Sequence, residues 1–215
     1  MKIFSNTAIS LDGRINTREG RFTLLGSPRD HARMELLREQ ADAVLVGGGT
    51  FRNWPNPSPR AGSGPPLWNV VVTRTLQVPL RPSFLTEPRI RPLFLTLASA
   101  IPPQFPADVE GYSGPGEDLP VPWIVDVLRR RGVERLLVEG GGDLIYQFLA
   151  ADALDELYVT LCPLVIGGDA PSLVDGAGFP LAELRRLRLL EADVAGDEIF
   201  LRYAVRRDSA GLAAT

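Results

Sequence analysis

The chain has 215 residues and a formal net charge of −3 at pH 7, with an isoelectric point near 5.3. This charge provides no broad basic field for nucleic acid or for an anionic membrane surface. The single cysteine, Cys162, excludes an intrachain disulfide and a thiolate zinc cluster and favours a reducing compartment, which we expect to be the cytoplasm.

The first part of the chain alternates strand and helix patterns. Residues 2–9 predict a strand that ends before an Asp-Gly turn. Ser27 as the N-cap, with proline at the first helical position, predicts a helix that runs to about Glu39. An aliphatic strand follows at 43–46. The proline-rich connection at 52–67 then has the length and composition of a functional flap.

The second part continues this alternation and then changes character. Short strands are predicted at 69–73, 93–97 and 136–138, and helices at 122–131 and from about 144 to 149. Apolar and polar residues alternate at 157–162 and 199–205, a pattern typical of half-covered antiparallel strands. We expect one domain over residues 1–207 and a disordered tail at 208–215.

This order of elements predicts an α/β fold. The sheet is expected to be mixed, parallel in the centre with antiparallel C-terminal strands, and covered by helices on both faces. In open sheets of this kind, ligands bind beyond the carboxyl ends of the strands. The site should therefore lie at that edge.

Two segments place glycines directly after an aliphatic strand, at 42–50 and 135–144. Such turns leave backbone amides uncovered at a helix N-terminus, where an anion gains hydrogen bonds and charge stabilisation. Two of them suggest a dinucleotide, although ordinary strand-to-helix turns would look the same. Neither is a P-loop, because no lysine follows. Neither is a Rossmann turn, because Arg52 and Ile145 occupy the position of the third glycine.

An ordered set of motifs then resembles a known family. The set consists of Ser10-Leu-Asp-Gly13, Leu37-Arg38, Asp42-Ala-Val-Leu-Val-Gly-x-Gly-Thr50, Val138-Glu-Gly-Gly141 with Leu144, Asp155-Glu-Leu157, Pro163 and Gly167. It is similar to the pyrimidine reductase of riboflavin biosynthesis, which is the carboxy-terminal half of a bifunctional deaminase-reductase or a stand-alone protein. That family has a dihydrofolate reductase-like fold. The resemblance covers about residues 2–205.

The resemblance implies an NADPH-dependent oxidoreductase. Its substrate would be 5-amino-6-(5-phosphoribosylamino)uracil or the 2,5-diaminopyrimidinone analogue, reduced at the ribosyl group to the ribityl product. No catalytic nucleophile and no metal are implied, so catalysis would come from alignment of the two bound molecules, with Asp12 and Glu139 as possible helpers. The family commonly forms homodimers. This chain has no zinc-deaminase pattern of His-x-Glu with paired cysteines.

The resemblance also implies site residues. Ala8, Leu24 and Thr50 match positions that contact the cofactor, and Arg38 and Glu139 match positions that contact the substrate. Arg60, after a one-residue deletion in the flap, lies where the family places a second substrate arginine. Arg74 is a candidate for the 2′-phosphate of NADPH. The further expected contacts are Gly48, Gly49, Gly140, Gly141, Gly142, Asp143 and Leu144 for the cofactor, and Asn53 for the substrate.

One departure affects the substrate assignment. Asn53-Trp54-Pro55 stands where the family usually has Asp-Asp-Pro. Two other functions therefore stay open: a dihydrofolate reductase-like NADPH reductase of another substrate, and a non-catalytic nucleotide-binding protein. Among single residues, Asp12 could simply form its turn, His31 is expected at the surface, and Cys162 is expected to be a packed side chain.

Overall fold

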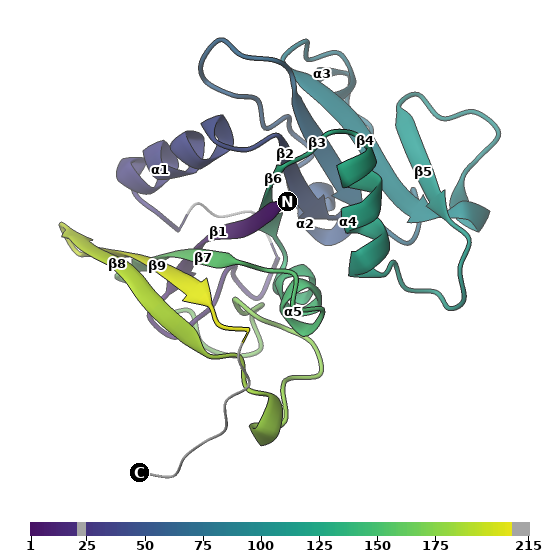
Figure 1. Ribbon diagram of the computed structural model, residues 1–215. Helices are drawn as coiled ribbons and strands as arrows, with labels where there is room; N and C mark the ends of the chain where they lie inside the picture. The colour runs from purple at the N-terminus through teal and green to yellow at the C-terminus, as the bar shows by residue number, and fades with distance from the viewer. Residues whose placement is uncertain (21–24, 208–215) are drawn as a thin grey trace.

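The computed structural model describes residues 1–20 and 25–207, and the strands of these residues form one sheet (Figure 1). The order across the sheet is β5-β4-β3-β2-β6-β1-β7-β9-β8. The expected tail at 208–215 and Leu24 lie outside the described residues. The strands are β1 (Lys2–Ser10), β2 (Ala43–Gly47), β3 (Leu67–Val72), β4 (Ile90–Leu97), β5 (Asp108–Tyr112), β6 (Arg135–Gly140), β7 (Glu156–Cys162), β8 (Leu187–Ala195) and β9 (Glu198–Val205).

The strand directions confirm a sheet that is parallel in the centre with antiparallel strands at its C-terminal side. All neighbours from β5 to β7 are parallel, and β9 runs antiparallel to both β7 and β8. The expected antiparallel pairing of residues 157–162 is confirmed with β9, and the structure adds that β7 is parallel to β1 on its other side. The alternating pattern of β7 indicates which residues share a face of the sheet and carries no information on strand direction.

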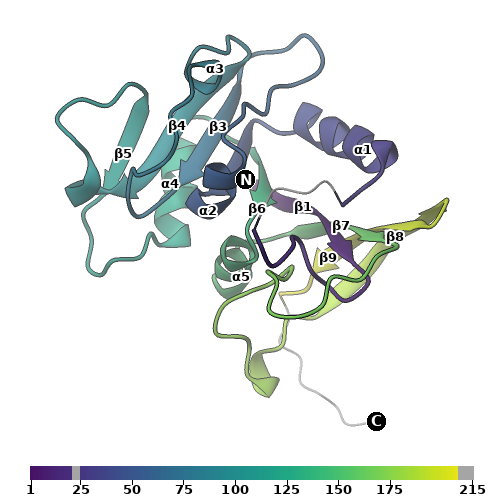
Figure 2. The same ribbon diagram turned by 180° about the vertical axis from the view of Figure 1, so that it is seen from behind.

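Helices cover both faces of the sheet, as expected. They are α1 (Pro28–Glu39), α2 (Gly48–Asn53), α3 (Pro82–Leu85), α4 (Val121–Arg130) and α5 (Gly142–Ala150), with short 3-10 helices η1 (Ala98–Ala100) and η2 (Leu181–Glu183). α4 and α5 pack into one core cluster, whereas α1, α2 and α3 contribute to two clusters on the other face. α4 is in front of the sheet in Figure 1, and α2 is in front of it in Figure 2.

Alternation along the central strands produces these two core layers. On β2, Ala43 and Leu45 belong to the cluster with α4 and α5, whereas Val44 packs with Leu37 of α1. All four side chains are buried. Because successive strand residues point to opposite faces, an uninterrupted aliphatic run is the pattern that a parallel strand covered on both sides requires.

Ser27 fixes the start of α1 against the antiparallel side of the sheet. Its hydroxyl oxygen accepts a hydrogen bond from the Arg29 N–H at 3.2 Å, as expected for an N-cap. The same hydroxyl donates to Glu198 Oε2 of β9 at 2.5 Å, and the Ser27 N–H donates to Glu198 Oε1 at 2.8 Å. The first turn of α1 is therefore held beside β9.

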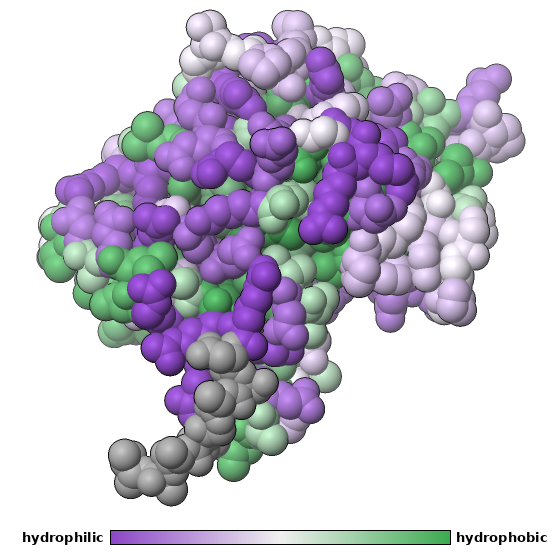
Figure 3. All heavy atoms as spheres, viewed as in Figure 1, coloured by the Kyte–Doolittle hydropathy of each residue, from purple (hydrophilic) through white to green (hydrophobic). Residues whose placement is uncertain are grey.

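The surface over β8 and β9 is mixed, with apolar residues between charged ones (Figure 3). Leu187, Leu189 and Val194 of β8 are exposed. None of the helices in residues 1–20 and 25–207 combines the length and the apolar composition that a bilayer crossing needs.

Candidate active site

A cleft of about 610 Å³ lies at the carboxyl ends of β1, β2 and β6, against α1 and the flap that follows α2. It brings together most of the residues expected from the sequence. Ten of them line it: Ala8, Arg38, Gly49, Thr50, Asn53, Glu139, Gly140, Gly141, Gly142 and Asp143. The edge of the sheet predicted to bind a ligand is therefore the edge that is hollowed.

The two glycine turns lie side by side, because β2 and β6 are neighbours in the sheet. A Cβ added to Gly140 would lie 2.9 Å from Thr50 Oγ1, so a side chain at this position would push the turns apart. Gly48 is restricted in a similar way by Thr73, whose Oγ1 would lie 2.7 Å from an added Cβ. Gly48 does not line the cleft. Its role in the structure is to let α2 begin close to the end of β3.

The second turn presents backbone amides at the start of α5. The Ile145 N–H makes the first helical hydrogen bond, to the Gly141 carbonyl oxygen at 3.1 Å. The amides of Gly142, Asp143 and Leu144 precede that bond and have no partner within the helix. Gly141 has a φ of +80°, a conformation that favours glycine. The turn predicted from the glycines is therefore present, with its amides at the cleft.

A loop from the C-terminal half of the chain closes one side of this turn. A Cβ on Gly142 would lie 2.2 Å from the Ser172 carbonyl oxygen, so only glycine permits this approach. Asp175 holds the loop, since its Oδ1 accepts hydrogen bonds from Ser172 Oγ at 2.5 Å and from Ser172 N at 3.2 Å. No sequence pattern predicted this loop, because its contacts to α5 join residues that are far apart in the chain.

Arg38 and Glu139 form a two-point ion pair in the wall of the cleft. Arg38 Nε donates to Oε1 at 2.7 Å and Nη2 donates to Oε2 at 2.7 Å. Their side chains are 15% and 8% exposed. Burial alone would lower the pKa of Arg38, but the Glu139 carboxylate outweighs it and raises that pKa. Arg38 therefore stays cationic, and its remaining N–H groups are available to an anion.

Two other residues expected at the site have their functional groups elsewhere. Leu144 is buried in the core with α4 and α5, so only its backbone could reach the cleft. Arg60 donates from Nη2 to the Ala41 carbonyl oxygen, behind the end of α1, and does not line the cleft. The flap carries Arg60 away from the position that sequence spacing suggested.

Arg74 and Asp12 also lie outside the cleft lining. Arg74 is exposed and lies 3.7 Å from Asp118. Asp12 Oδ1 accepts from Ser10 Oγ at 2.6 Å, and Oδ2 accepts from the Gly167 N–H at 2.7 Å. These bonds, that from Ser10 first, lower the pKa of Asp12 to about 2. Asp12 thus ties the turn after β1 to the loop that follows β7.

The structure adds a polar wall that sequence reasoning missed. Asp30 and His31 of α1 and Asn6 of β1 all line the cleft, and Asp30 and Asn6 are buried. Burial raises the pKa of Asp30, and the Glu198 carboxylate adds to the shift. The expected surface position of His31 was wrong, because its side chain is half-buried and its Nε2 is enclosed.

The flap is fixed over the cleft by a side chain from β3. Asn69 accepts from the Ser58 N–H at 2.7 Å and donates from Nδ2 to the Ser58 carbonyl oxygen at 3.1 Å. Asn53 and Trp54, which replace two acids of the family pattern, line the cleft beside it. The sequence did contain a signal for this contact, because Asn69 is a single amide side chain within the aliphatic run of β3.

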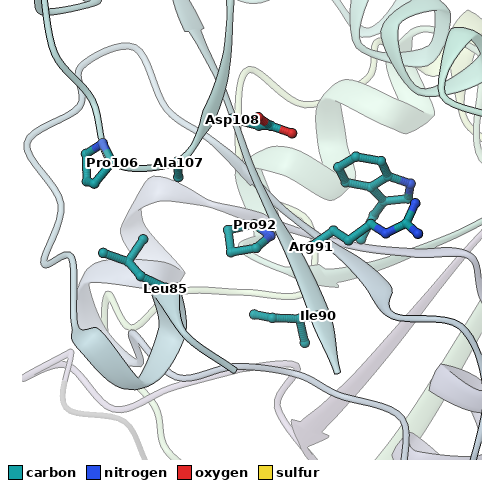
Figure 4. A pocket seen from close by; sticks show the side chains of 8 residues that line it. Leu85, Ile90, Arg91, Pro92, Pro106, Ala107 and Asp108 are labelled. Atoms are coloured by element: carbon teal, nitrogen blue, oxygen red, sulfur yellow. The ribbon is translucent and has the colours of Figure 1, made fainter. Parts of the chain in front are cut away.

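A second cavity, of about 320 Å³, lies at the opposite ends of β3, β4 and β5 (Figure 4). Its lining is largely apolar, and Arg91 stacks on Trp68 there with 5.4 Å between Cζ and the ring centroid. None of its lining residues has a buried polar atom without a partner. The carboxyl-end cleft is therefore the candidate active site.

Comparisons with known proteins find a matching family model, similar sequences and similar structures. The RibD C-terminal domain family model matches residues 1–201. A reductase of 2,5-diamino-6-ribosylamino-4(3H)-pyrimidinone 5′-phosphate from Methanothermobacter thermautotrophicus is 30% identical, with 95% of this chain and 98% of that protein covered. The enzyme of the same name from Archaeoglobus fulgidus is 28% identical, with 91% and 94% covered. The solved structure of Acinetobacter baumannii RibD superposes with a TM-score of 0.79 at 18% identity, covering 96% of this chain and 58% of that one.

Proposed function

The chain belongs to the RibD C-terminal domain family, and from this premise we propose that it is an NADPH-dependent reductase of riboflavin biosynthesis. Its substrate is 2,5-diamino-6-ribosylamino-4(3H)-pyrimidinone 5′-phosphate or the deaminated uracil analogue, and its product carries a ribityl chain. The observation that carries the proposal is the shared cleft, in which the glycine turn of α5 and the Arg38–Glu139 pair face the same space.

The residues of the cleft fit a dinucleotide. The free amides of Gly142, Asp143 and Leu144 suit a pyrophosphate, and Gly49 leaves open space in front of α2, since an added Cβ would meet nothing within 4 Å. Ala8 at the end of β1 offers a small apolar surface to a nicotinamide ring. When bound, the cofactor supplies the hydride.

The Asp143 and Asp175 carboxylates also line the cleft beside the α5 turn, and their negative charges repel a phosphate group there. Asp175 is engaged by Ser172, and Asp143 accepts from Gln147 Nε2 at 3.1 Å. These neutral donors leave both carboxylates charged, so we infer that the amides of the turn and the positive end of the α5 dipole outweigh this repulsion when they bind the pyrophosphate. We expect the 2′-phosphate to depend on side chains outside the turn, with Arg74 as the candidate.

The ion pair fits the phosphorylated sugar. Arg38 retains N–H groups beyond those that bind Glu139, and a phosphate is the anion that a guanidinium binds in two-point fashion. Glu139 has lone pairs left to accept hydrogen bonds from sugar hydroxyls. Asn53 lies near enough to the cleft to add a neutral hydrogen-bonding group.

These residues place the sugar carbon next to the cofactor and exclude water around it, without a protein nucleophile. Catalysis then depends on alignment of two bound molecules and on complementary charge. We further propose that residues 1–207 act as one domain in the cytoplasm, and that two copies associate through the apolar surface of β8. The exposed Leu187, Leu189 and Val194 support that association.

The test is steady-state turnover of the purified chain with NADPH and each of the two pyrimidines. We expect loss of NADPH absorbance, formation of the ribityl product and a much lower rate with NADH. Binding of NADPH without turnover of either pyrimidine would contradict the proposal. Dihydrofolate is included as a substrate because Trp54, 47% exposed, replaces an acid in the cleft wall. Its selective reduction would support the second candidate function.

A further inference from the structure

Asp30 is not among the groups assigned above to the cofactor or the sugar phosphate, yet it is one of the few acids that are buried in the described part of the chain. It lies in the first turn of α1, is 7% exposed and lines the cleft. Its Oδ1 is enclosed and has no hydrogen-bond partner among the described residues. A buried carboxylate oxygen without a donor costs free energy, so a purely structural role would leave this cost uncompensated.

The groups around Asp30 satisfy it only in part. The Thr160 hydroxyl of β7 favours the charged form of Asp30, but neither Asp30 Oδ1 nor Thr160 Oγ1 makes a hydrogen bond of normal geometry. Glu198 is the acidic neighbour of Asp30 and is itself bound to Ser27. His31 and Arg33 lie close enough to favour the charged form. The Arg33 guanidinium, however, donates from Nη2 to the Leu201 carbonyl oxygen at 2.8 Å and stacks on Tyr158. The Asp30 carboxyl group, which lines the cleft, is thus incompletely satisfied by the protein and can accept from a ligand that brings its own N–H donors.

The Asp30 carboxyl group packs against a glycine, Gly26, at the cleft wall. Gly26 lines the cleft beside it, and a Cβ on Gly26 would lie 2.1 Å from Asp30 Oδ2. Any larger residue at position 26 would displace the carboxyl group from its present place. The absence of a side chain there keeps Asp30 at the cleft.

The residues of α1 that line the cleft carry opposite charges at its two ends. Asp30 is in the first turn and Arg38 in the last turn, roughly 12 Å apart at 1.5 Å per residue. A phosphate is attracted to the Arg38 end and repelled from the Asp30 end. A molecule with a ring, a sugar chain and a terminal phosphate therefore binds with its ring toward Asp30.

We propose that Asp30 recognises the pyrimidine ring and selects the 2-amino form of the substrate over the 2-oxo form. The proposal rests on the proposed function and adds the residue that sets its substrate preference. A 2-amino-4(3H)-pyrimidinone presents the ring N3–H and the 2-amino group as two adjacent donors, which match the two oxygens of one carboxylate. In the uracil, N3–H is flanked by two carbonyl oxygens, which a carboxylate repels.

The test compares kcat/KM for the two pyrimidine phosphates in the wild-type chain, Asp30→Asn and Asp126→Asn. Asparagine keeps the shape of the side chain and presents one donor and one acceptor, which match the 2-oxo group and N3–H of the uracil. Asp126 is an exposed acid on α4, across the sheet, and serves as the matched control.

We expect the wild-type chain to prefer the diaminopyrimidinone. Asp30→Asn should lower kcat/KM for that substrate roughly 10- to 100-fold and shift the ratio toward the uracil, because a charge-assisted pair is lost. The KM for NADPH should stay within about twofold, as expected for a residue that contacts only the pyrimidine, and Asp126→Asn should match the wild type.

Two results would overturn the inference while leaving the reductase assignment intact. One is a wild-type chain that reduces both pyrimidines equally, and the other is an Asp30→Asn variant in which both substrates lose activity by the same factor. If the wild-type chain reduces neither pyrimidine, the proposed function itself is wrong and the role of Asp30 falls with it.

Discussion

Arg38 and Glu139 are 101 residues apart in the chain and meet as a fork, with Nε to Oε1 and Nη2 to Oε2 both at 2.7 Å. The pair joins the last turn of α1 to the end of β6, across the cleft wall. Because both side chains are largely buried, neither can lose its partner without leaving a desolvated charge. The same groups that we assign to substrate binding thus also hold α1 against the sheet.

Arg38→Ala is therefore expected to raise the KM for the pyrimidine substrate by roughly tenfold or more, since the phosphate loses a two-point partner. The NADPH KM should change by less than about twofold. Steady-state kinetics at saturating NADPH measure both effects. Arg38→Lys, which keeps the charge but not the fork, should fall between the wild type and Arg38→Ala. Equal losses for substrate and cofactor would contradict the assignment.

The same substitution should lower stability. Removing one member of a buried pair costs on the order of 3 kcal/mol in the free energy of unfolding, because Glu139 is left without its cation. Urea titration of Arg38→Ala and of the double variant Arg38→Ala with Glu139→Gln separates the loss of the ion pair from the cost of leaving Glu139 charged without a partner. The double variant should recover part of the loss.

Gly49→Val tests the cofactor end of the cleft. An added Cβ at Gly49 meets nothing in the protein within 4 Å, so the substitution should fold normally. Its side chain would project into the space assigned to NADPH and should raise the cofactor KM by roughly tenfold or more. Gly62→Val, at an exposed position beside Glu39, serves as the control. Unchanged NADPH binding in Gly49→Val would show that the cofactor lies elsewhere.

Asp12→Ala tests whether Asp12 contributes to catalysis or only connects the turn after β1 to the loop after β7 by hydrogen bonds. The Asp12 carboxylate also accepts from the Ile166 N–H at 3.1 Å, so its loss should loosen the segment around Ile166 and Gly167. We expect faster proteolytic cleavage there and KM values within about threefold of the wild type. The folded-state pKa of about 2 is below the ordinary value, so the tie persists above pH 4 and weakens as pH falls toward 2.

The sequence predicted the layers of the fold better than their details. Aliphatic runs such as that of β2 indicate strands covered on both faces, and the cap at Ser27 placed the start of α1 correctly. β5 and β8 were missed. β5 has a short, weakly apolar sequence, and β8 is exposed along most of its length, so neither shows a burial pattern.

The site was predicted where backbone chemistry defines it and missed where tertiary packing does. Glycines after a strand indicated the α5 turn, because few other residues adopt a φ of +80°. The position of Arg60 depends on how the flap folds, which spacing along the chain cannot determine. Asp30 did carry a signal. It precedes Met34 and Leu37 by four and seven residues, so an acid stands on the apolar face of α1.

Cys162 should be unreactive in the folded protein. Its side chain is 1% exposed, and burial, with the Glu198 and Asp30 carboxylates nearby, raises the pKa of the thiol to about 12. Titration with a thiol reagent at pH 8 should label the chain only after unfolding in denaturant. Rapid labelling of the native protein, at a rate close to that of the unfolded chain, would contradict the buried position on β7.

The burial of Asp30 should also be visible in stability. Its pKa is raised in the folded state, because burial disfavours the charged form and outweighs the effect of the Thr160 hydroxyl and of the nearby His31 and Arg33, while the Glu198 carboxylate adds to the shift. The unfolded chain releases this proton at a lower pH, so the wild type loses stability as pH rises through the folded pKa of Asp30. Asp30→Asn, which has no charge to desolvate, should escape that loss and unfold at a higher urea midpoint near neutral pH.

Asp30→Asn should therefore lose its advantage as pH falls below the ordinary pKa of an aspartate, where Asp30 is protonated in both states. Urea midpoints measured across this range, with Asp126→Asn as the control, give the difference directly. Asp126 is exposed and forms a surface ion pair with Arg130, so its substitution should shift the midpoint little at any pH. If Asp30→Asn is less stable than the wild type at neutral pH, then the Asp30 carboxylate stabilises the fold, and its burial at the cleft needs no ligand to explain it.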